Sequence, residues 1–222
     1  MTRDFSIALD AASLASLAYG MPNLRNQEAA GIIRVNNGIQ DIGVAGTENF
    51  RDFLDDFDVD IVHRGYGGWV FKGIADYSDL LIAALLPVLK KDLPIALRGH
   101  SLGGASVVDI AMHLHSLGYQ VIDVHTFAAP PAGMESLAKA FAASGIPCTA
   151  YEHVRDLIPR INPILGASKV GDRVWIEDAK WYPSDPGENL LFRAEELIAF
   201  PHHMLAKYTS VLSGLVTIQG AA

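Results

Sequence analysis

A serine flanked by glycines lies between a largely apolar run and a run with helical spacing. Residues 99–105 read GHSLGGA; residues 93–98 precede them, and residues 105–112 follow with apolar side chains at helical spacing. This pattern predicts a buried strand, a tight turn and a helix, which is the setting that exposes a serine hydroxyl as a nucleophile. The glycines let neighbouring backbone approach Ser101 without a clashing Cβ. We therefore expect Ser101 to attack an electrophile, with the N–H groups of the following helix favouring negative charge beside it.

A serine nucleophile needs a base to accept its proton and an acid to orient that base. Among the acids after Ser101, Asp156 is the best placed, because it directly follows a predicted strand at 148–154. Functional side chains of α/β sheets lie at the carboxyl ends of strands. The alternative roles of Asp156 are a helix N-cap or an ion pair with a neighbouring arginine. The weaker candidate acids lie inside a predicted strand or in a polar segment, and they are Asp123, Asp172, Asp178 and Asp185.

The histidines narrow the choice of base. Only His202 and His203 lie late in the chain, so one of them is the expected base. His100 is expected to be packed or hydrogen-bonded rather than catalytic. His113 and His115 are two residues apart on a predicted helix, so they point to different faces and make a poor pair of metal ligands.

Length and composition are those of a globular protein. The chain has 222 residues, half of them hydrophobic and 19% charged, and a single domain over 1–222 is expected. A net charge of -8 without a basic cluster argues against a nucleic-acid partner. The single cysteine, Cys148, excludes an internal disulfide and a cysteine-based zinc site. No apolar run reaches the ~18 residues of a membrane span, and the N-terminus lacks the pattern of a cleavable signal peptide. The expected location is therefore the cytoplasm, or outside the cell after export without such a signal.

Helices and strands are predicted to alternate along the chain. The expected helices lie at 5–19, 69–91 and 105–118, with another ending near Gly145. The expected strands lie at 32–35, 39–44, 59–62, 93–98, 121–127 and 148–154, and an Asn-Gly turn joins the first two as a hairpin. This alternation predicts an α/β fold with a mostly parallel central sheet and helices on both faces. Serine, then aspartate, then histidine is the chain order of the α/β-hydrolase triad.

Further segments make the chain similar to the class 3 lipases, the α/β-hydrolase family of fungal and plant triacylglycerol lipases. They occur in the order of the family motifs and extend from Thr47 to Tyr208. The segments are 44–47 (VAGT) with 51–56 (RDFLDD), 62–66 (VHRGY), 99–105 (GHSLGGA), 126–133 (TFAAPPAG), 153–160 (HVRDLIPR), and His203 with Tyr208. The departures from the family pattern are Ala45, in place of an arginine, and Ala128, in place of a glycine.

The resemblance implies a set of site residues. By that resemblance, Ser101, Asp156 and His203 form the catalytic triad, and Thr47 lies at the oxyanion hole. The backbone N–H of Leu102 would be the second oxyanion donor, as the strand-turn-helix pattern independently indicates. The resemblance implies no metal and no cofactor.

Residues 48–58 have the pattern of a short amphipathic helix. Its apolar positions follow the spacing i, i+3, i+4 and i+7, and they are Phe50, Phe53, Leu54 and Phe57. The segment directly follows Thr47, and the similar family carries its lid in this stretch. We expect the apolar face to cover the site in water and to turn outward at a lipid surface, with which the protein makes transient contact. The alternative is that this face packs permanently on the core.

The predicted function is serine-dependent hydrolysis of carboxylic esters in lipids, as by a triacylglycerol lipase, through an acyl-enzyme. One alternative is a phospholipase acting on membrane lipids, and another is an esterase of small esters without interfacial activation. A non-catalytic binding module on the same fold is less favoured, because Ser101, Asp156 and His203 are all present.

Overall fold

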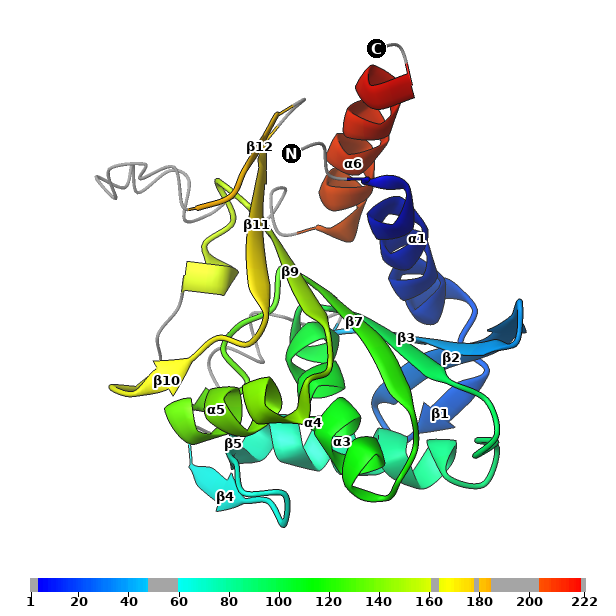
Figure 1. The fold of residues 1–222 in the computed structure, drawn as a ribbon, viewed down its shortest axis with the longest axis vertical. Coiled ribbons are helices and arrows are strands. Elements are labelled where there is room, and N and C mark those ends of the chain that lie inside the picture. The colour runs from blue at the N-terminus through cyan, green and yellow to red at the C-terminus, as the bar shows by residue number, and fades with distance from the viewer. Residues whose placement is uncertain (1–3, 48–59, 161–163, 178–179, 185–203, 221–222) are drawn as a thin grey trace.

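An eight-stranded sheet forms the centre of the structure (Figure 1), a computed structural model that describes residues 4–47, 60–160, 164–177, 180–184 and 204–220. The predicted lid at 48–58 and both late histidines, His202 and His203, lie outside these residues. In spatial order the strands are β1 (Leu24–Asn26), β2 (Ala29–Asn36), β3 (Ile39–Val44), β6 (Ile95–His100), β7 (Val121–Phe127), β9 (Cys148–His153), β11 (Asp172–Glu177) and β12 (Lys180–Tyr182).

The sheet is parallel in its centre and antiparallel at its edges. Strands β3, β6, β7, β9 and β11 are parallel neighbours, whereas β1, β2 and β12 pair antiparallel with theirs. Val44 pairs with Gly99, Gly99 with Thr126, and Phe127 with Tyr151, so the carboxyl ends of four strands lie side by side. Side chains that directly follow these strands are thereby brought together at one edge, and the predicted mostly parallel sheet is confirmed.

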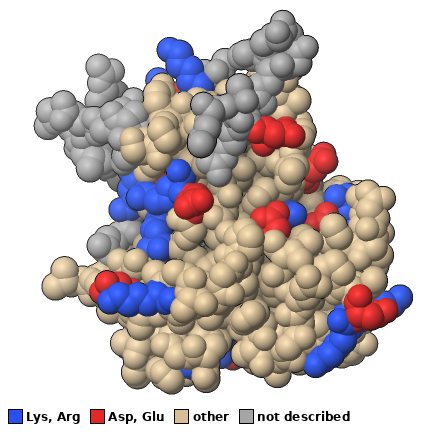
Figure 2. Space-filling view, in the orientation of Figure 1, with Lys and Arg blue, Asp and Glu red and all other residues tan. Residues whose placement is uncertain are grey.

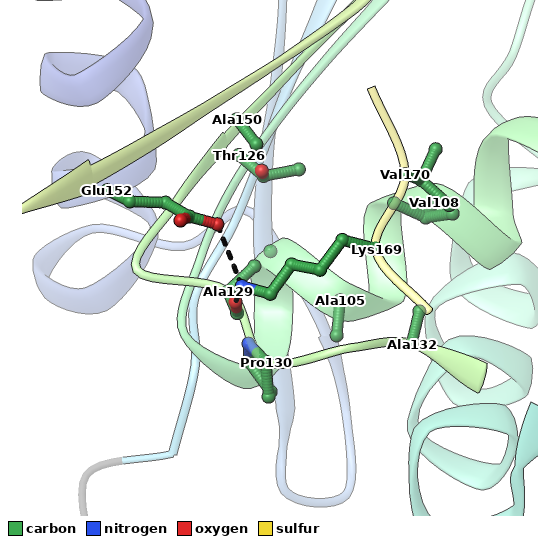
Figure 3. A pocket seen from close by; sticks show the side chains of 11 residues that line it. Ala105, Val108, Thr126, Ala129, Pro130, Ala132, Ala150, Glu152, Lys169 and Val170 are labelled. Atoms are coloured by element: carbon green, nitrogen blue, oxygen red, sulfur yellow. Dashed lines mark hydrogen bonds and ion pairs between the residues drawn. The ribbon is translucent and has the colours of Figure 1, made fainter. Parts of the chain in front are cut away.

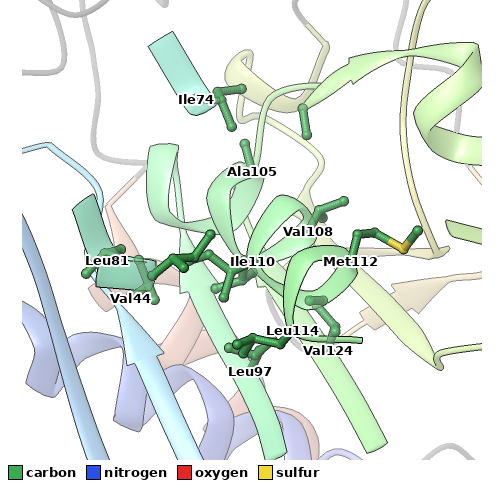
Figure 4. Packing of buried hydrophobic residues seen from close by; sticks show 14 of the residues in the cluster. Val44, Ile74, Leu81, Leu97, Ala105, Val108, Ile110, Met112, Leu114 and Val124 are labelled. Carbon is green, nitrogen blue, oxygen red and sulfur yellow. The ribbon is translucent and has the colours of Figure 1, made fainter. Parts of the chain in front are cut away.

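Helices cover both faces of this sheet, as predicted. On one face lie α3 (Lys72–Leu85), α4 (Leu102–Ser116) and α5 (Glu135–Ser144), and on the other lie α1 (Ser6–Gly20) and α6 (Leu205–Gly220). Helix α4 packs against α3 and against β6 and β7 (Figure 4), and 12 of its residues are buried. The helix that begins directly after Ser101 is therefore fixed on all sides by the apolar core.

The predicted helix at 69–91 is wrong at both ends. Its first three residues form β5 (Trp69–Phe71), which pairs with β4 (Ile61–His63) through Val70 and Val62. Helix α3 therefore begins at Lys72 and ends at Leu85. Strand β5 also pairs with β8 (Gly133–Met134), which pairs with β10 (Ala167–Ser168), and these four short strands form a second sheet. The strand partners of residues 69–71 are tertiary neighbours, which helical spacing along the sequence does not reveal.

Acidic and basic side chains lie next to one another at several places on the face shown in Figure 2. Surface ion pairs of the described chain include Arg34 with Asp41 at 3.1 Å and Lys139 with Glu135 at 2.9 Å. Within the described ranges, no helix is long and apolar enough to cross a membrane.

Candidate active site

Ser101 lies at the tight turn between β6 and α4, so the predicted strand-turn-helix arrangement is confirmed. Its backbone has φ 56° and ψ -126°, a conformation that only glycine adopts readily. The Ser101 N–H donates to the carbonyl of Phe127 at 2.9 Å, and its carbonyl accepts from the Ala105 N–H at 3.1 Å. A strained non-glycine residue persists only where its surroundings hold it, and such residues concentrate at functional sites.

Close backbone contacts explain why glycines surround Ser101. A Cβ on Gly99 would lie 2.3 Å from the carbonyl oxygen of Gly103, and a Cβ on Gly103 would lie 2.3 Å from that of Ala45. Backbone atoms of a strand and a helix cannot move aside without breaking their hydrogen bonds. Glycine at both positions therefore allows the ends of β3 and β6 to pack against the first turn of α4.

The segment that carries Thr47 packs directly against the turn. A Cβ on Gly46 would lie 2.9 Å from the Cβ of Ser101. The Gly46 N–H donates to the hydroxyl of Tyr19 at 2.8 Å, and this hydroxyl lies 2.7 Å from Nδ1 of His100. Because His100 directly precedes Ser101, Tyr19 ties the backbone before Thr47 to the turn. The expectation that His100 is buried and hydrogen-bonded is confirmed.

Leu102 is the first residue of α4, on the other side of Ser101. Its N–H belongs to the first helical turn, whose N–H groups have no acceptor within the helix. These groups and the helix dipole favour negative charge at this end. Gly46, which directly precedes Thr47, and Leu102 thus both adjoin Ser101. The roles of Thr47 and Leu102 as oxyanion donors stay a prediction.

Asp156 lies just after β9 and is 1% exposed. Its Oδ1 accepts a hydrogen bond from the Ile158 N–H at 3.0 Å, and its Oδ2 accepts one from the Tyr208 hydroxyl at 2.7 Å. Ile158 begins the short 3₁₀ helix η1 (Ile158–Arg160), so Asp156 also acts as the cap that the sequence left open as an alternative. Both carboxylate oxygens are therefore fixed by donors, which gives the side chain one orientation.

Tyr208, on α6, contacts both Asp156 and the end of β9. Its hydroxyl donates to Asp156 and accepts from the His153 N–H at 2.8 Å, and its ring centroid lies 6.3 Å from that of His100. Burial raises the pKa of Tyr208 well above its usual value, and the Asp156 carboxylate raises it further. The hydroxyl therefore stays protonated as a donor at neutral pH. In the sequence, Tyr208 stands out only as part of the family ending, and no local pattern indicates its contact with Asp156.

We expect Tyr208→Phe to lower both stability and activity. The change removes one donor from Asp156 and leaves the buried His153 N–H without its acceptor, which costs about 1–3 kcal/mol in the free energy of unfolding. Activity is expected to fall by about tenfold, because Asp156 keeps its bond from Ile158. Denaturant unfolding and kcat for a soluble ester measure the two effects. Tyr119→Phe, at the amino end of β7, is the control, and equal effects of both variants would contradict a specific role for Tyr208.

The other candidate acids that the structure describes lie elsewhere. Asp123, in the amino half of β7, pairs with Arg98 at 3.0 Å, and Asp172 is the exposed first residue of β11. Asp178 and Asp185 lie outside the described residues. Among the described candidates, Asp156 alone lies at the same edge of the sheet as Ser101.

Cys148, the single cysteine, is buried at the start of β9. Burial, together with the negative charges of Asp123 and Asp172, raises the pKa of its thiol to about 12. Because the thiolate is the nucleophilic form, this thiol is not expected to act as a nucleophile at neutral pH. Within the described part of the chain, His, Cys, Asp and Glu side chains form no group of three that could hold a metal ion.

Comparison of the sequence with protein families identifies relatives of this chain. Residues 41–166, more than half of the chain, match the family described as lipase (class 3). The lipase of Rhizomucor miehei is 27% identical over 124 residues, which cover 53% of this chain and 33% of that protein. The lipase of Rhizopus niveus is 26% identical over 145 residues, which cover 60% of this chain and 37% of that protein. The chain therefore spans about a third of the length of these relatives.

Solved structures share the fold. A lipase from Rhizopus microsporus var. chinensis matches with a TM-score of 0.69 at 18% identity, over 97% of this chain and 91% of that one. The triacylglyceride lipase of Rhizomucor miehei matches with a TM-score of 0.68 at 20% identity, over 95% of each chain. These matches confirm the α/β-hydrolase fold. Together with the family match across β3, the turn at Ser101 and Asp156, they show that the chain belongs to the class 3 lipase family.

Proposed function

We propose that this protein hydrolyses carboxylic esters of lipids through an acyl-enzyme on Ser101. The observation that carries the proposal is the strained turn at Ser101, next to the first turn of α4 and at the same sheet edge as the buried Asp156. In the first step, the Ser101 hydroxyl attacks the ester carbonyl while His203 accepts its proton. His203 then donates this proton to the leaving alcohol, and the acyl group stays on Ser101. Asp156 holds His203 in the required tautomer and stabilises its charged form.

The second step returns the enzyme to its starting state. A water molecule loses a proton to His203 and attacks the acyl carbonyl, after which Ser101 leaves and takes the proton back from His203. In both steps the carbonyl oxygen becomes negatively charged. The backbone N–H groups of Thr47 and Leu102 are the proposed donors to it, and one such donor typically contributes about 3 kcal/mol to the stability of the transition state.

We further propose that the substrate is a lipid at an interface, because the predicted helix at 48–58 has one apolar face and directly follows Thr47. Activity on a short triglyceride is expected to rise abruptly once the substrate exceeds its solubility, since an interface binds that apolar face. Phe53→Ser should blunt this rise and leave hydrolysis of a soluble ester unchanged. Asp55→Ser, on the polar face of the same predicted helix, is the matched control and should keep the rise. A pH-stat assay across the solubility limit measures both.

A substrate panel separates this proposal from its alternatives. It compares triacylglycerol, monoacylglycerol, phospholipid vesicles and soluble short-chain esters under the same conditions. A clear preference for phospholipid would make the protein a phospholipase. A rate that passes smoothly through the solubility limit would contradict the lid and leave a small-ester esterase.

A further inference from the structure

A partly buried lysine, Lys169, connects the loop after β7 to β9, the strand that leads to Asp156. The Lys169 ammonium donates to the carbonyl of Ala129 at 2.7 Å and to Oε1 of Glu152 at 2.8 Å (Figure 3). The Lys169 side chain is 17% exposed and that of Glu152 is 1% exposed. Lys169 itself comes from the segment between β10 and β11, so it joins three separate parts of the chain.

Glu152 has a second cationic partner. Its Oε2 accepts hydrogen bonds from Nε of Arg173 at 3.0 Å and from Nη2 at 2.5 Å. One nearly inaccessible carboxylate is thus shared by a lysine and an arginine. Because Arg173 already compensates the charge of Glu152, the ion pair does not by itself account for Lys169. The contact with Ala129 is what Lys169 adds.

The loop that Lys169 holds is strained and adjoins the nucleophile. Ala128 has φ 55°, in the left-handed region, and its N–H donates to the carbonyl of Tyr151 at 3.1 Å. The residue before it, Phe127, accepts the hydrogen bond from the Ser101 N–H. A Cβ on Gly104 would lie 2.9 Å from the Cβ of Ala129, so this loop also packs on the first turn of α4. A shift of Ala129 would therefore reach Ser101 through both the strand end and the helix.

We propose that Lys169 is a positioning residue that fixes the loop after β7 against β9 and thereby sets the position of Ser101 relative to Asp156. On one side it holds Ala129, next to the strained Ala128. On the other side it holds Glu152, whose neighbour His153 donates to Tyr208, the partner of Asp156. This inference rests on the proposed function, because it assigns Lys169 to the same site.

The space around Lys169 determines which substitutions are informative. The cavity beside it is only about 10 Å³, close to the least space that one water molecule requires, and it is lined by Thr126, Ala150 and Val170 among others. Methionine has nearly the length of lysine and fits without a new void. Arginine replaces the compact ammonium with a larger planar guanidinium, so Lys169→Arg is not a conservative change here.

The titration of Lys169 gives the proposal a second observable. Burial lowers the pKa of Lys169 to about 8; Glu152 and Asp156 oppose this shift, and Arg173 adds to it. Loss of the proton removes the charge from its hydrogen bonds to Ala129 and Glu152, so activity should fall above about pH 8. Because the folded pKa lies below the ordinary value of 10.5, the unfolded chain binds more protons between these values. The contribution of this group to stability therefore rises with pH while activity falls.

The test uses Lys169→Met in the full chain, measured well below its melting temperature. With a soluble ester at pH 7, kcat is expected to fall by about tenfold or more while KM changes by less than about twofold, since positioning and not binding is affected. The fall in activity above pH 8 should disappear. Lys139→Met, an exposed lysine on α5, is the control and should keep both the rate and the pH profile.

A double variant separates positioning from charge compensation. In Lys169→Met with Glu152→Gln, the buried carboxylate is gone but Ala129 still lacks its donor, so kcat should stay low. Recovery of the wild-type rate in the double variant would overturn the proposal. The proposal would also be overturned if the activity of Lys169→Met fell above pH 8 as it does in the wild type. If Lys169→Met does not fold, the proposal is tested on the wild type by the rate at which a fluorophosphonate labels Ser101. This rate is expected to fall above pH 8 while the protein stays folded, and a rate that does not fall would overturn the proposal. Labelling of the wild type without any lipid hydrolysis would instead contradict only the proposed substrate.

Discussion

Ser101→Ala is expected to lose about 10⁴-fold or more in kcat and to keep the fold. Without the hydroxyl the proposed acyl-enzyme cannot form. Because the members of a triad act as a unit, the proposed partners His203 and Asp156 cannot replace it. The measurements are kcat with a soluble p-nitrophenyl ester, fluorophosphonate labelling, and denaturant unfolding. Ser106→Ala is the matched control, because Ser106 is a buried serine of α4 whose hydroxyl donates to the carbonyl of Leu102. It should keep both labelling and most of the rate.

Ser101→Gly tests whether the strain at this position is real. Glycine adopts φ 56° without penalty, and the relief of about 1–3 kcal/mol offsets the ~1 kcal/mol entropic cost of glycine. The variant should therefore be inactive and at least as stable as the wild type. A clear loss of stability in Ser101→Gly, or substantial activity in Ser101→Ala, would contradict the assignment of a strained nucleophile.

The parts of the fold that surround Ser101 could be predicted because their signals are local. Strand β7 lies at its predicted bounds, and the hairpin turn at Asn37 and Gly38 has the positive φ values, 50° and 78°, that an Asn-Gly turn requires. The glycines around Ser101 also act over short distances in the sequence. Pattern and turn chemistry are sufficient for such elements.

The parts that were not predicted depend on tertiary partners. Strand β11 carries Arg173 and Trp175 on one face, so its sequence does not have the pattern of an apolar strand. In the structure, the guanidinium groups of Arg160 and Arg173 lie 4.3 and 4.7 Å from the centroid of the Trp175 ring and cover it. Helix α6 has no acidic residue in its first turn that would indicate its start. The roles proposed for Tyr208 and Lys169 arise from contacts between residues 52 and 40 positions apart. Such contacts leave no periodic pattern in the sequence.

The structure describes some residues of the predicted site and not others. Ser101, Thr47, Leu102 and Asp156 lie at one edge of the sheet, where the carboxyl ends of β3, β6, β7 and β9 meet. His203 and the apolar residues of 48–58 lie outside the described residues, so their roles stay predictions. The choice of His203 over His202 rests on its spacing to Tyr208, whose position beside Asp156 is described.

Asp156→Asn is expected to cause the second large loss of activity, about 10⁴-fold in kcat, because an amide does not hold the base in its required tautomer or stabilise its charged form. Asparagine is also a poor structural substitute here. Asp156 accepts hydrogen bonds on both oxygens, among them those from Ile158 and Tyr208, whereas the amide has one oxygen and directs N–H groups at the other donor. The free energy of unfolding should therefore fall by about 1–3 kcal/mol.

The comparison of Asp156→Asn with Tyr208→Phe separates the proposed catalytic role of this carboxylate from its contribution to stability. Tyr208→Phe disturbs the packing and hydrogen bonding around Asp156 but leaves its charge, so a similar loss of stability should accompany a much smaller loss of kcat. Asp172→Asn, at the exposed start of β11, is the control for a change of charge and should alter neither quantity. If Asp156→Asn kept a rate close to that of Tyr208→Phe, the carboxylate would be structural. The acid would then have to be sought among the remaining sequence candidates, Asp178 and Asp185.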